Sequence, residues 1–319
     1  MSSFRIGTLI IASSLLSLAF LELGLRAIKS VYMDGVLHIS SSSINNVPHS
    51  KYGWLSPSSV SYEKSDSCYG SGVVSYNSQG FRAPPVGRAS DANYKVCILG
   101  DSTMQGYQLP DGTHLPHLLA QELEAQGYDP YVLPLAVGGY GSLQEWMLFE
   151  DFCKAIEPDL IVWHWSGNDI TNNSYLADSH SGSNNARPRP YFENGKIEMK
   201  RAYPLSISEK IDWMLTTRLV NGLLLEYWQK DQYFQDKYKE IGWSVAEVMI
   251  ERVASSEIPI VALVQDSAER AKSIFQKAGI QLAQYSDFDE SHQCLPRDGH
   301  PNKLGHQHML TALSPFFGS

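Results

Sequence analysis

Predicted strands and helices alternate along most of this 319-residue chain, and the alternation constrains the fold more than any other feature. Short apolar runs predict four buried strands, at Lys95–Leu99, Tyr131–Val137, Leu160–Trp165 and Ile258–Val264. Longer segments predict helices at Leu115–Gln126, Ser142–Ile156, Ser206–Tyr238, Ser244–Ser255, Ser267–Ala278 and Leu304–Phe316. Strands joined through helices form right-handed crossovers. This order therefore predicts an α/β fold, a three-layer α/β/α sandwich with a mostly parallel sheet.

The alternating region, residues 93–319, is expected to form one domain with an insert at about residues 172–240. Within the insert, Asn194-Gly195 is the preferred two-residue hairpin turn, so Arg189–Arg201 is expected to form a small β-ribbon. Residues 33–92 are rich in serine, which interrupts any regular period, and we expect them to form a loop-rich extension.

The N-terminus differs from the rest of the chain because Ile6–Leu21 carries no charge. Sixteen residues are short for a spanning helix, which needs about 20, but Glu22 and Arg26 could pair at i,i+4 and extend the span. We therefore predict that residues 1–32 form a signal-anchor or transmembrane segment. The competing interpretation is a cleaved signal peptide, although no Ala-x-Ala site follows the apolar run cleanly. Both interpretations predict an extracytoplasmic domain. An anchor would hold it at the membrane, and a cleaved signal peptide would leave it secreted.

Composition excludes several classes of protein. The chain has 25 Lys and Arg against 34 Asp and Glu, a net charge of −9, which argues against nucleic acid as the main partner. Its 7 Trp, 17 Tyr and 11 Phe provide enough packing material to exclude intrinsic disorder. Four cysteines in a chain of this size do not make a disulfide scaffold.

Polar or glycine-rich turns follow three of the predicted strands. These turns are Gly100-Asp101-Ser102, Gly138-Gly139-Tyr140-Gly141 and Gly167-Asn168-Asp169, and Asp298-Gly299-His300 lies just before the last helix. In open parallel sheets, ligands bind beyond the carboxyl ends of the strands. A hydroxyl, hydrogen-bond donors and a carboxylate beside an imidazole are what acyl transfer through a serine nucleophile requires. This chemistry needs no cofactor and no metal.

With these four blocks in this order, the chain resembles the SGNH hydrolases, the GDSL-type esterase superfamily. More narrowly, it is similar to membrane-anchored bacterial members, through Glu22-Leu23-Gly24-Leu25-Arg26 after the apolar run and the NxxGFR element Asn77–Arg82. The resemblance covers about Asn77–Phe317 together with the anchor, and it implies a flavodoxin-like sheet. A nucleophile elbow of the α/β-hydrolase kind is excluded, because no G-x-S-x-G occurs in the sequence.

The resemblance implies a role for each block. Ser102 would be the nucleophile, His300 the base that removes its proton, and Asp298 the acid that orients the imidazole. An oxyanion hole would form from the backbone N–H groups of Ser102 and Gly139 and the side-chain amide of Asn168. Many relatives place the acid three residues before the histidine, whereas Asp298 lies two before His300. The alternative is a Ser–His dyad whose histidine is oriented by a backbone carbonyl.

Several of these residues also have purely structural interpretations. Ser102 could cap a helix, Asn168 could be a turn residue, and His292 is a weaker candidate base. Asp169 and Asn172 are expected to hold their loop, and Asn302 to cap the last helix. His306 and His308 stand at i,i+2 on a helix and do not face each other, so no metal site is predicted.

The cysteines divide by context. Cys97 lies in a predicted strand and Cys153 in a predicted helix, so both are expected to be buried free thiols. Cys68 and Cys294 lie in predicted loops, and in an exported domain they could form a disulfide that fixes the N-terminal extension against the loop of Asp298.

These inferences predict a serine esterase that removes acyl groups, with acetyl favoured, from an acylated small molecule or an extracytoplasmic glycan. Alternatives within enzymes are a lipid esterase or thioesterase and a sugar O-acyltransferase. An inactive glycan-binding assembly subunit is the alternative outside enzymes. The expected partners are the acylated substrate and the membrane that holds the N-terminal helix.

Overall fold

The computed structural model describes residues 3–32, 46–84, 86–179, 187–202, 208–211, 213–229 and 232–317. Its centre is a sheet of five parallel strands, β5 (Tyr94–Gly100), β6 (Pro130–Ala136), β7 (Leu160–His164), β10 (Ile260–Gln265) and β11 (Gln281–Tyr285). The strands lie in the order β11-β10-β7-β5-β6, so the predicted parallel sheet is confirmed. The edge strand β11 was not among the predicted strands, because Gln281 and Gln284 interrupt its apolar residues, which neither form an apolar run nor alternate strictly with polar ones.

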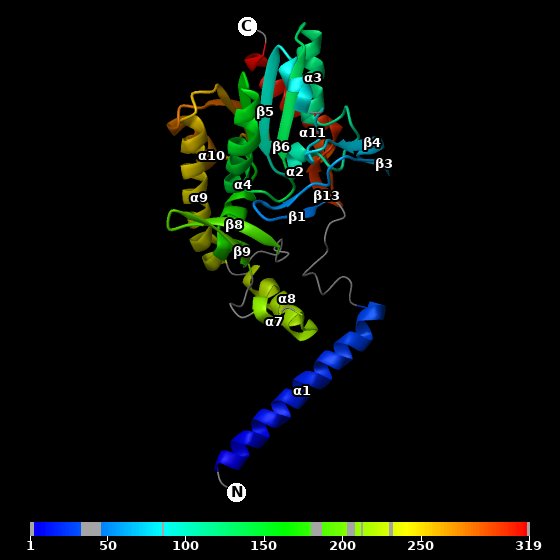
Figure 1. Ribbon diagram of the computed structural model, residues 1–319, viewed down its shortest axis with the longest axis vertical. Coiled ribbons are helices and arrows are strands. Elements are labelled where there is room, and N and C mark those ends of the chain that lie inside the picture. Colours follow the sequence, from blue (N-terminus) through cyan, green and yellow to red (C-terminus); the bar gives the residue numbers. More distant parts are fainter. Residues whose placement is uncertain are drawn as a thin grey trace.

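Helices cover both faces of the sheet (Figure 1), as the predicted three-layer sandwich requires. One face packs against α3 (Leu115–Ala125) and α11 (Lys303–Leu313). The other packs against α4 (Ser142–Leu148), α9 (Gln232–Ala254) and α10 (Glu269–Lys277). The strand period of two explains both cores, because Cys97 and Leu99 of β5 enter one and Val96 and Ile98 the other.

The helix predicted over Ser142–Ile156 is an α-helix only as far as Leu148, the end of α4. A π-helical turn, η2 (Phe149–Cys153), and a 3₁₀ turn, η3 (Lys154–Ile156), complete it. The expectation of free thiols at Cys97 and Cys153 is wrong, because the structure joins them in a disulfide, with Cα atoms 5.9 Å apart. They lie 56 residues apart in sequence and meet because β5 and η2 contribute to the same buried core.

The expectation of a loop-rich segment at residues 33–92 is wrong for residues 47–76, which hold two antiparallel hairpins. One is β1 (Val47–His49) with β2 (Gly53–Leu55), and the other is β3 (Val60–Asp66) with β4 (Gly70–Tyr76). The serines that suggested loops form cross-strand pairs instead, with Oγ atoms 3.2 Å apart for Ser61–Ser75 and 2.8 Å apart for Ser65–Ser71. Residues 33–45 lie outside the described chain.

The insert contains α5 (Asp169–Asn173), α6 (Tyr175–Ser179), α7 (Ser208–Ile211) and α8 (Leu215–Gln229). Its predicted ribbon is present as β8 (Pro188–Glu193) and β9 (Lys196–Arg201), and both turn residues, Asn194 and Gly195, have positive φ. The break predicted between Tyr238 and Ser244 does not occur, since α9 runs through Gly242. A Cβ built there would lie 1.9 Å from the backbone oxygen of Ile170, so glycine is what lets α9 pass α5.

The remaining elements are short. At the carboxyl edge of the sheet are α2 (Ser102–Gln105), β12 (Gln293–Cys294) and β13 (Asp298–Pro301). Three 3₁₀ turns complete the list: η1 (Val86–Ser90), η4 (Glu290–His292) and η5 (Ser314–Phe316).

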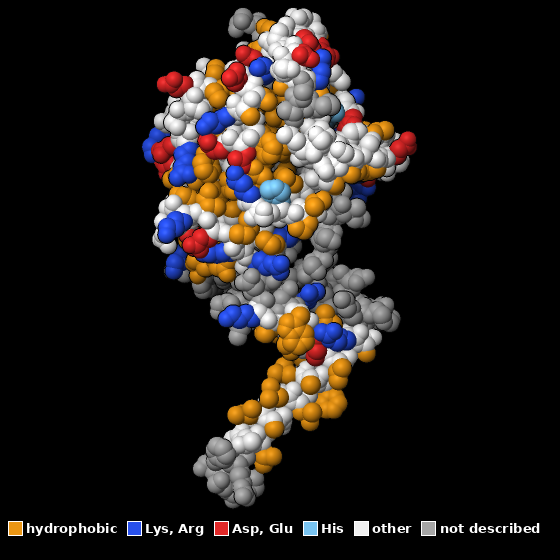
Figure 2. All heavy atoms as spheres, viewed as in Figure 1, with side chains coloured by type: hydrophobic (Ala, Val, Ile, Leu, Met, Phe, Trp, Pro, Cys, Tyr) orange, Lys and Arg blue, Asp and Glu red, His pale blue; other side chains and the backbone are white. Residues whose placement is uncertain are grey.

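The N-terminal helix α1 (Ser3–Tyr32) projects from the body of the molecule, and apolar side chains line its length (Figures 1 and 2). Within it, Ile6–Ala27 is long and apolar enough to cross a membrane, with a mean hydropathy of 2.0. The predicted pair between Glu22 and Arg26 is present, with Oε1 and Nε 2.8 Å apart. The same sequence pattern is shared by anchors and by signal peptides.

Candidate active site

Three of the predicted site residues meet at the carboxyl edge of the sheet. Ser102 Oγ lies 2.8 Å from His300 Nε2, although the two residues are 198 positions apart. On the other side of the ring, His300 Nδ1 lies 2.6 Å from Asp298 Oδ1, which also accepts the backbone N–H of His300 at 3.0 Å. These contacts form a continuous hydrogen-bonded chain from hydroxyl to imidazole to carboxylate.

The turn after β5 explains why Gly-Asp-Ser is needed there. A Cβ at residue 100 would lie 2.6 Å from Met104 Cγ, so only glycine allows α2 to begin so close to the strand. Asp101, rather than Ser102, caps α2, because its carboxylate accepts the backbone N–H of Thr103 at 3.0 Å. The Ser102 hydroxyl is therefore not used for capping and can face His300.

The electrostatics of the site favour an ionised Asp298. Partial burial raises the pKa of its carboxyl group, but hydrogen bonds from the side chain and backbone of His300, and from Tyr69, outweigh burial and hold the pKa below its ordinary value. The Tyr69 hydroxyl also lies 3.3 Å from the backbone oxygen of His300. The Tyr107 ring packs edge to face with the imidazole, with ring centroids 5.9 Å apart. Asp298 is thus a carboxylate at neutral pH, in contact with a fixed histidine.

A cavity of about 310 Å³ opens on these residues. The polar members of its lining include Ser102, His300, Asp298 and Asn168, together with Ser166, Gln265 and Gln293. Asn168 precedes α5, is exposed, and can present its amide to a ligand held near Ser102. Gly139 is not part of this lining. Its neighbour Gly138 lies closer, since a Cβ there would be 3.6 Å from Ser102 Cβ.

The glycine turn after β6 is held by side chains that the sequence did not point to. Gln105 Oε1 accepts the N–H of Gly138 at 2.9 Å, and Trp54 Nε1 donates to its carbonyl at 3.1 Å. The side chain of Asn172 donates to the carbonyl of Tyr140 at 3.1 Å, as expected of a residue that holds the loop. Gly139 has φ +80°, a conformation that favours glycine. No local pattern marks Gln105 or Trp54, because their partners are distant in sequence.

The NxxGFR element acts on the helix that carries Ser102. Arg82 is buried, pairs with Asp111 at 2.6 Å, and donates to the backbone oxygens of Gln105 and Gly106. These carbonyls end α2, so the buried guanidinium fixes the C-terminus of the helix whose N-terminus is Ser102.

A disulfide joins Cys68 to Cys294, so the pair considered from the sequence is present in the structure. Asp66 and Arg297 form an ion pair of 2.7 Å beside it. Together they connect the β3–β4 hairpin to the segment that ends in Asp298 and His300.

The other candidate residues have structural contacts. His292 pairs with Asp289 at 2.8 Å, and Asn302 caps α11 by accepting the N–H groups of Leu304 and Gly305. Buried His306 accepts the N–H of Leu115 at 3.0 Å, and His308 Nε2 lies 2.9 Å from Ser286 Oγ.

Beneath the site, a buried acid lies in the core. Glu145 is fully buried and accepts the indole N–H of Trp163 at 2.7 Å. Burial raises the pKa of its carboxyl group to about 8, although the bond from Trp163 opposes the shift.

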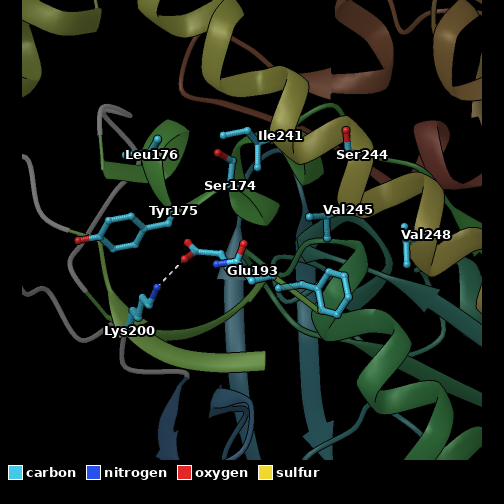
Figure 3. Close-up of a pocket in the computed structure, with 11 residues that line it drawn as sticks. Ser174, Tyr175, Leu176, Glu193, Lys200, Ile241, Ser244, Val245 and Val248 are labelled. Carbon is cyan, nitrogen blue, oxygen red and sulfur yellow. Dashed lines mark hydrogen bonds and ion pairs between the residues drawn. The ribbon is translucent and has the colours of Figure 1, made fainter. Parts of the chain in front are cut away.

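A larger cavity of about 580 Å³ lies away from Ser102, between α6, the β8–β9 ribbon and α9 (Figure 3). Lys200 points toward Glu193 across the ribbon, with Nζ and Oε2 2.6 Å apart, and mostly apolar side chains line the rest. Of these two cavities, the smaller is the candidate active site, because its lining contains Ser102, His300 and Asp298 and that of the larger does not.

The model of the GDSL-like lipase/acylhydrolase family matches residues 98–308, more than half of the chain. The chain belongs to this family. It is therefore a hydrolase that acts on ester bonds. No curated protein sequence matches the chain.

Solved structures of esterases are similar to it at low identity. A putative acylhydrolase from Bacteroides fragilis is 14% identical, over 70% of this chain and 85% of its own, with a TM-score of 0.36. A catalytic mutant of the acetylxylan esterase Axe2 from Geobacillus stearothermophilus is 10% identical, over 72% and 96%, with a TM-score of 0.41. The acetyl xylan esterase AlAXEase is 13% identical, over 70% and 100%, with a TM-score of 0.42.

Proposed function

We propose that this protein is a membrane-anchored serine esterase that removes short acyl groups, acetyl above all, from a polyol or glycan outside the cytoplasm. The observation that carries the proposal is the hydrogen-bonded chain from Ser102 through His300 to Asp298 at the edge of a cavity. A serine hydroxyl becomes a competent nucleophile only when a base is placed to remove its proton, and His300 Nε2 occupies that position.

In the proposed mechanism, Ser102 Oγ attacks the ester carbonyl while His300 takes its proton, and Asp298 stabilises the imidazolium. The tetrahedral intermediate collapses when His300 returns the proton to the leaving alcohol. Water then attacks the acyl-serine with His300 again acting as base, which releases the acid and restores the hydroxyl. The Ser102 and Gly139 backbone N–H groups and the Asn168 amide are the proposed oxyanion donors.

The cavity favours a short acyl group. Its volume of about 310 Å³ is at the lower end of the range for small-molecule sites, and polar residues make up much of its lining. A long acyl chain would need an apolar channel of matching length. Gln265 and Gln293 instead offer hydrogen-bonding groups suited to a hydroxylated alcohol.

The contacts of α1 support an uncleaved anchor. The Glu22 carboxylate accepts the backbone N–H groups of Leu215 and Thr216 at 3.0 and 2.9 Å, so α1 satisfies the first turn of α8. Cleavage on the C-terminal side of Glu22 would leave this turn without its cap, and cleavage directly before Glu22 would remove the helix that holds the cap in place. A helix that the mature fold uses in this way is better explained as a retained segment than as a discarded signal.

The cysteines support placement outside the cytoplasm. All four are paired, as Cys68–Cys294 and Cys97–Cys153. Disulfides persist in oxidising compartments and are rare in the cytosol.

The function is tested with the full-length protein and p-nitrophenyl esters of increasing acyl length, beside acetylated sugars. We expect kcat/KM to be highest for acetyl or propionyl and to fall at least tenfold by octanoyl. Acetate should also be released from the sugars. Preference for octanoyl would contradict the proposed substrate class, and labelling by a fluorophosphonate without hydrolysis of any ester would favour an acyltransferase.

The anchor is tested separately by carbonate extraction of membranes and N-terminal sequencing. We expect the protein in the membrane pellet with residues 1–32 intact. A soluble protein whose sequence begins after Leu21 would establish a cleaved signal.

A further inference from the structure

The first turn of α8 is fixed to α1 by two neighbouring residues. Glu22, although charged, is only 8% exposed, and it also accepts the hydroxyl of Thr216 at 3.1 Å. Arg26 pairs with Glu22 and donates to the backbone oxygen of Trp213 at 3.2 Å. Figure 1 shows α8 meeting α1 at an angle. The position of α8 along α1 is therefore defined.

These contacts lie near the C-terminal end of the apolar span Ile6–Ala27. A helix of this length measures about 33 Å at 1.5 Å per residue, close to the roughly 30 Å of a bilayer's hydrocarbon core. With α1 spanning the membrane, Glu22 and Arg26 lie at the interface with water on the side of the sheet. The start of α8 lies at the same depth.

The exposed apolar residues of α8, and Trp213 just before it, suit this depth. Trp213, Leu223 and Tyr227 are 67%, 58% and 68% exposed, and Val220 is 45% exposed. Positions 220, 223 and 227 follow the i, i+3, i+7 spacing of one helix face. Trp and Tyr are enriched where membranes meet water, because their rings are apolar and their N–H and O–H groups bind water.

We propose that the α8 face, formed by Val220, Leu223 and Tyr227 together with Trp213 just before the helix, rests in the interfacial layer of the bilayer that α1 spans. The inference rests on the proposed anchoring of α1. Figure 1 shows α2 and β13, which carry Ser102 and His300, at the end of the sheet that faces α8 and α1. The insert thus holds the active site toward the membrane, where it meets acylated molecules attached to or lying on the surface.

The test uses the full-length protein in phosphatidylcholine vesicles with and without brominated acyl chains, which quench tryptophan on contact. We expect brominated vesicles to quench wild-type emission, and Trp213→Phe to lose at least a third of that quenching. Trp146→Phe, which removes a half-buried indole beside Arg252, should keep it. Equal quenching of wild type and Trp213→Phe would overturn the inference.

A second variant avoids reliance on one tryptophan. Leu223→Asp places a charge on the α8 face and should lower the quenching of the wild-type tryptophans by at least a third. Val73→Asp is the matched control, since Val73 is 41% exposed on the β3–β4 hairpin, and it should change nothing. Equal quenching in both variants and wild type would contradict the inference.

Vesicle flotation separates the proposal that α1 is an anchor from the proposal that the α8 face rests in the bilayer interface. Protein that does not float with the vesicles would show that α1 is not an anchor, which would overturn both the proposed anchoring and the proposed position of α8. Protein that floats but keeps full quenching in Trp213→Phe and Leu223→Asp would overturn only the position of α8.

Discussion

At the scale of single residues, the contact between Asp298 and His300 shows how a two-residue spacing brings an acid to an imidazole. The carboxylate oxygen Oδ1 reaches both Nδ1 and the backbone N–H of His300. One atom therefore orients the ring and accepts the hydrogen bond of the backbone N–H group. The dyad considered from the sequence would instead need a backbone carbonyl on Nδ1, and the structure places Asp298 there.

Asp298→Asn should lower kcat about 10³–10⁴-fold, because an amide neither fixes the correct tautomer nor stabilises the imidazolium. The measurement is kcat on a short p-nitrophenyl ester, with the melting temperature as a check on folding. Asp289→Asn is the control, since Asp289 pairs with His292 outside the hydrogen-bonded chain and should leave kcat unchanged. A loss of less than tenfold for Asp298→Asn would contradict the triad.

Asn168→Ala should lower kcat about 10²–10³-fold with little change in KM, as expected when one oxyanion donor is removed. Asn168→Asp keeps the size of the side chain but removes the amide donor, and should lose a similar amount. Steady-state kinetics on the same ester measure both. An effect confined to KM would show that Asn168 binds the substrate rather than the transition state.

Glu145 makes a prediction about pH and stability. Its pKa is raised from 4.5 to about 8 by burial, so between these values the folded protein binds more protons than the unfolded chain. Stability is therefore greatest below pH 4.5 for this group and is lost as pH rises through about 8. Glu145→Gln, which keeps an acceptor for Trp163, lacks this titration and should gain about 2 kcal/mol of stability relative to wild type as pH rises from 6 to 8. Urea unfolding at pH 6 and pH 8 measures this, and an equal pH dependence in both proteins would contradict it.

At the scale of elements, the Cys68–Cys294 disulfide and the Asp66–Arg297 pair join the β3–β4 hairpin to the segment that carries Asp298 and His300. The hairpin therefore belongs to the support of the site, although it precedes the first strand of the sheet.

Replacing both Cys68 and Cys294 by serine should destabilise the protein by about 2–5 kcal/mol. It should also lower kcat/KM about tenfold, because the segment of Asp298 loses its attachment. Replacing Cys97 and Cys153 by alanine removes the other disulfide, which lies in the core away from the site, and should lower stability alone. Thermal unfolding and kcat/KM at 25 °C measure both. Unchanged kcat/KM in the first variant would show that the disulfide serves only stability.

The sequence predicts the parts of this structure that local patterns determine. Strands β5, β6, β7 and β10 are predicted because each is an apolar run. Ser102, Asn168 and His300 are predicted because they stand in motifs at strand ends or before a helix. Edge strand β11 and the serine-rich β3–β4 hairpin carry polar residues between apolar ones, so neither contains an apolar run that would predict a strand. Gln105, Trp54 and the Cys97–Cys153 pair depend on contacts between distant segments, which spacing along the chain does not reveal.

At the scale of the whole molecule, α1, the insert and the candidate active site lie toward the same end of the sheet (Figure 1). The apolar helix α1 fixes α8 through Glu22, and the carboxyl edge of the sheet faces the same side (Figure 1). In the proposed arrangement, the active site works close to the membrane surface. The acidic net charge of −9 disfavours an anionic polymer as substrate.

The central claim is that Ser102 is the nucleophile of an esterase. The most direct measurement treats wild type, Ser102→Ala and Ser166→Ala with a fluorophosphonate and follows labelling and hydrolysis of a short ester together. Ser166 is the matched control, since it lines the same cavity but lies outside the hydrogen-bonded chain to Asp298. We predict labelling and hydrolysis in wild type and Ser166→Ala. In Ser102→Ala, labelling should be absent and kcat lowered at least about 10⁴-fold. Labelling or near-normal hydrolysis in Ser102→Ala would contradict the account.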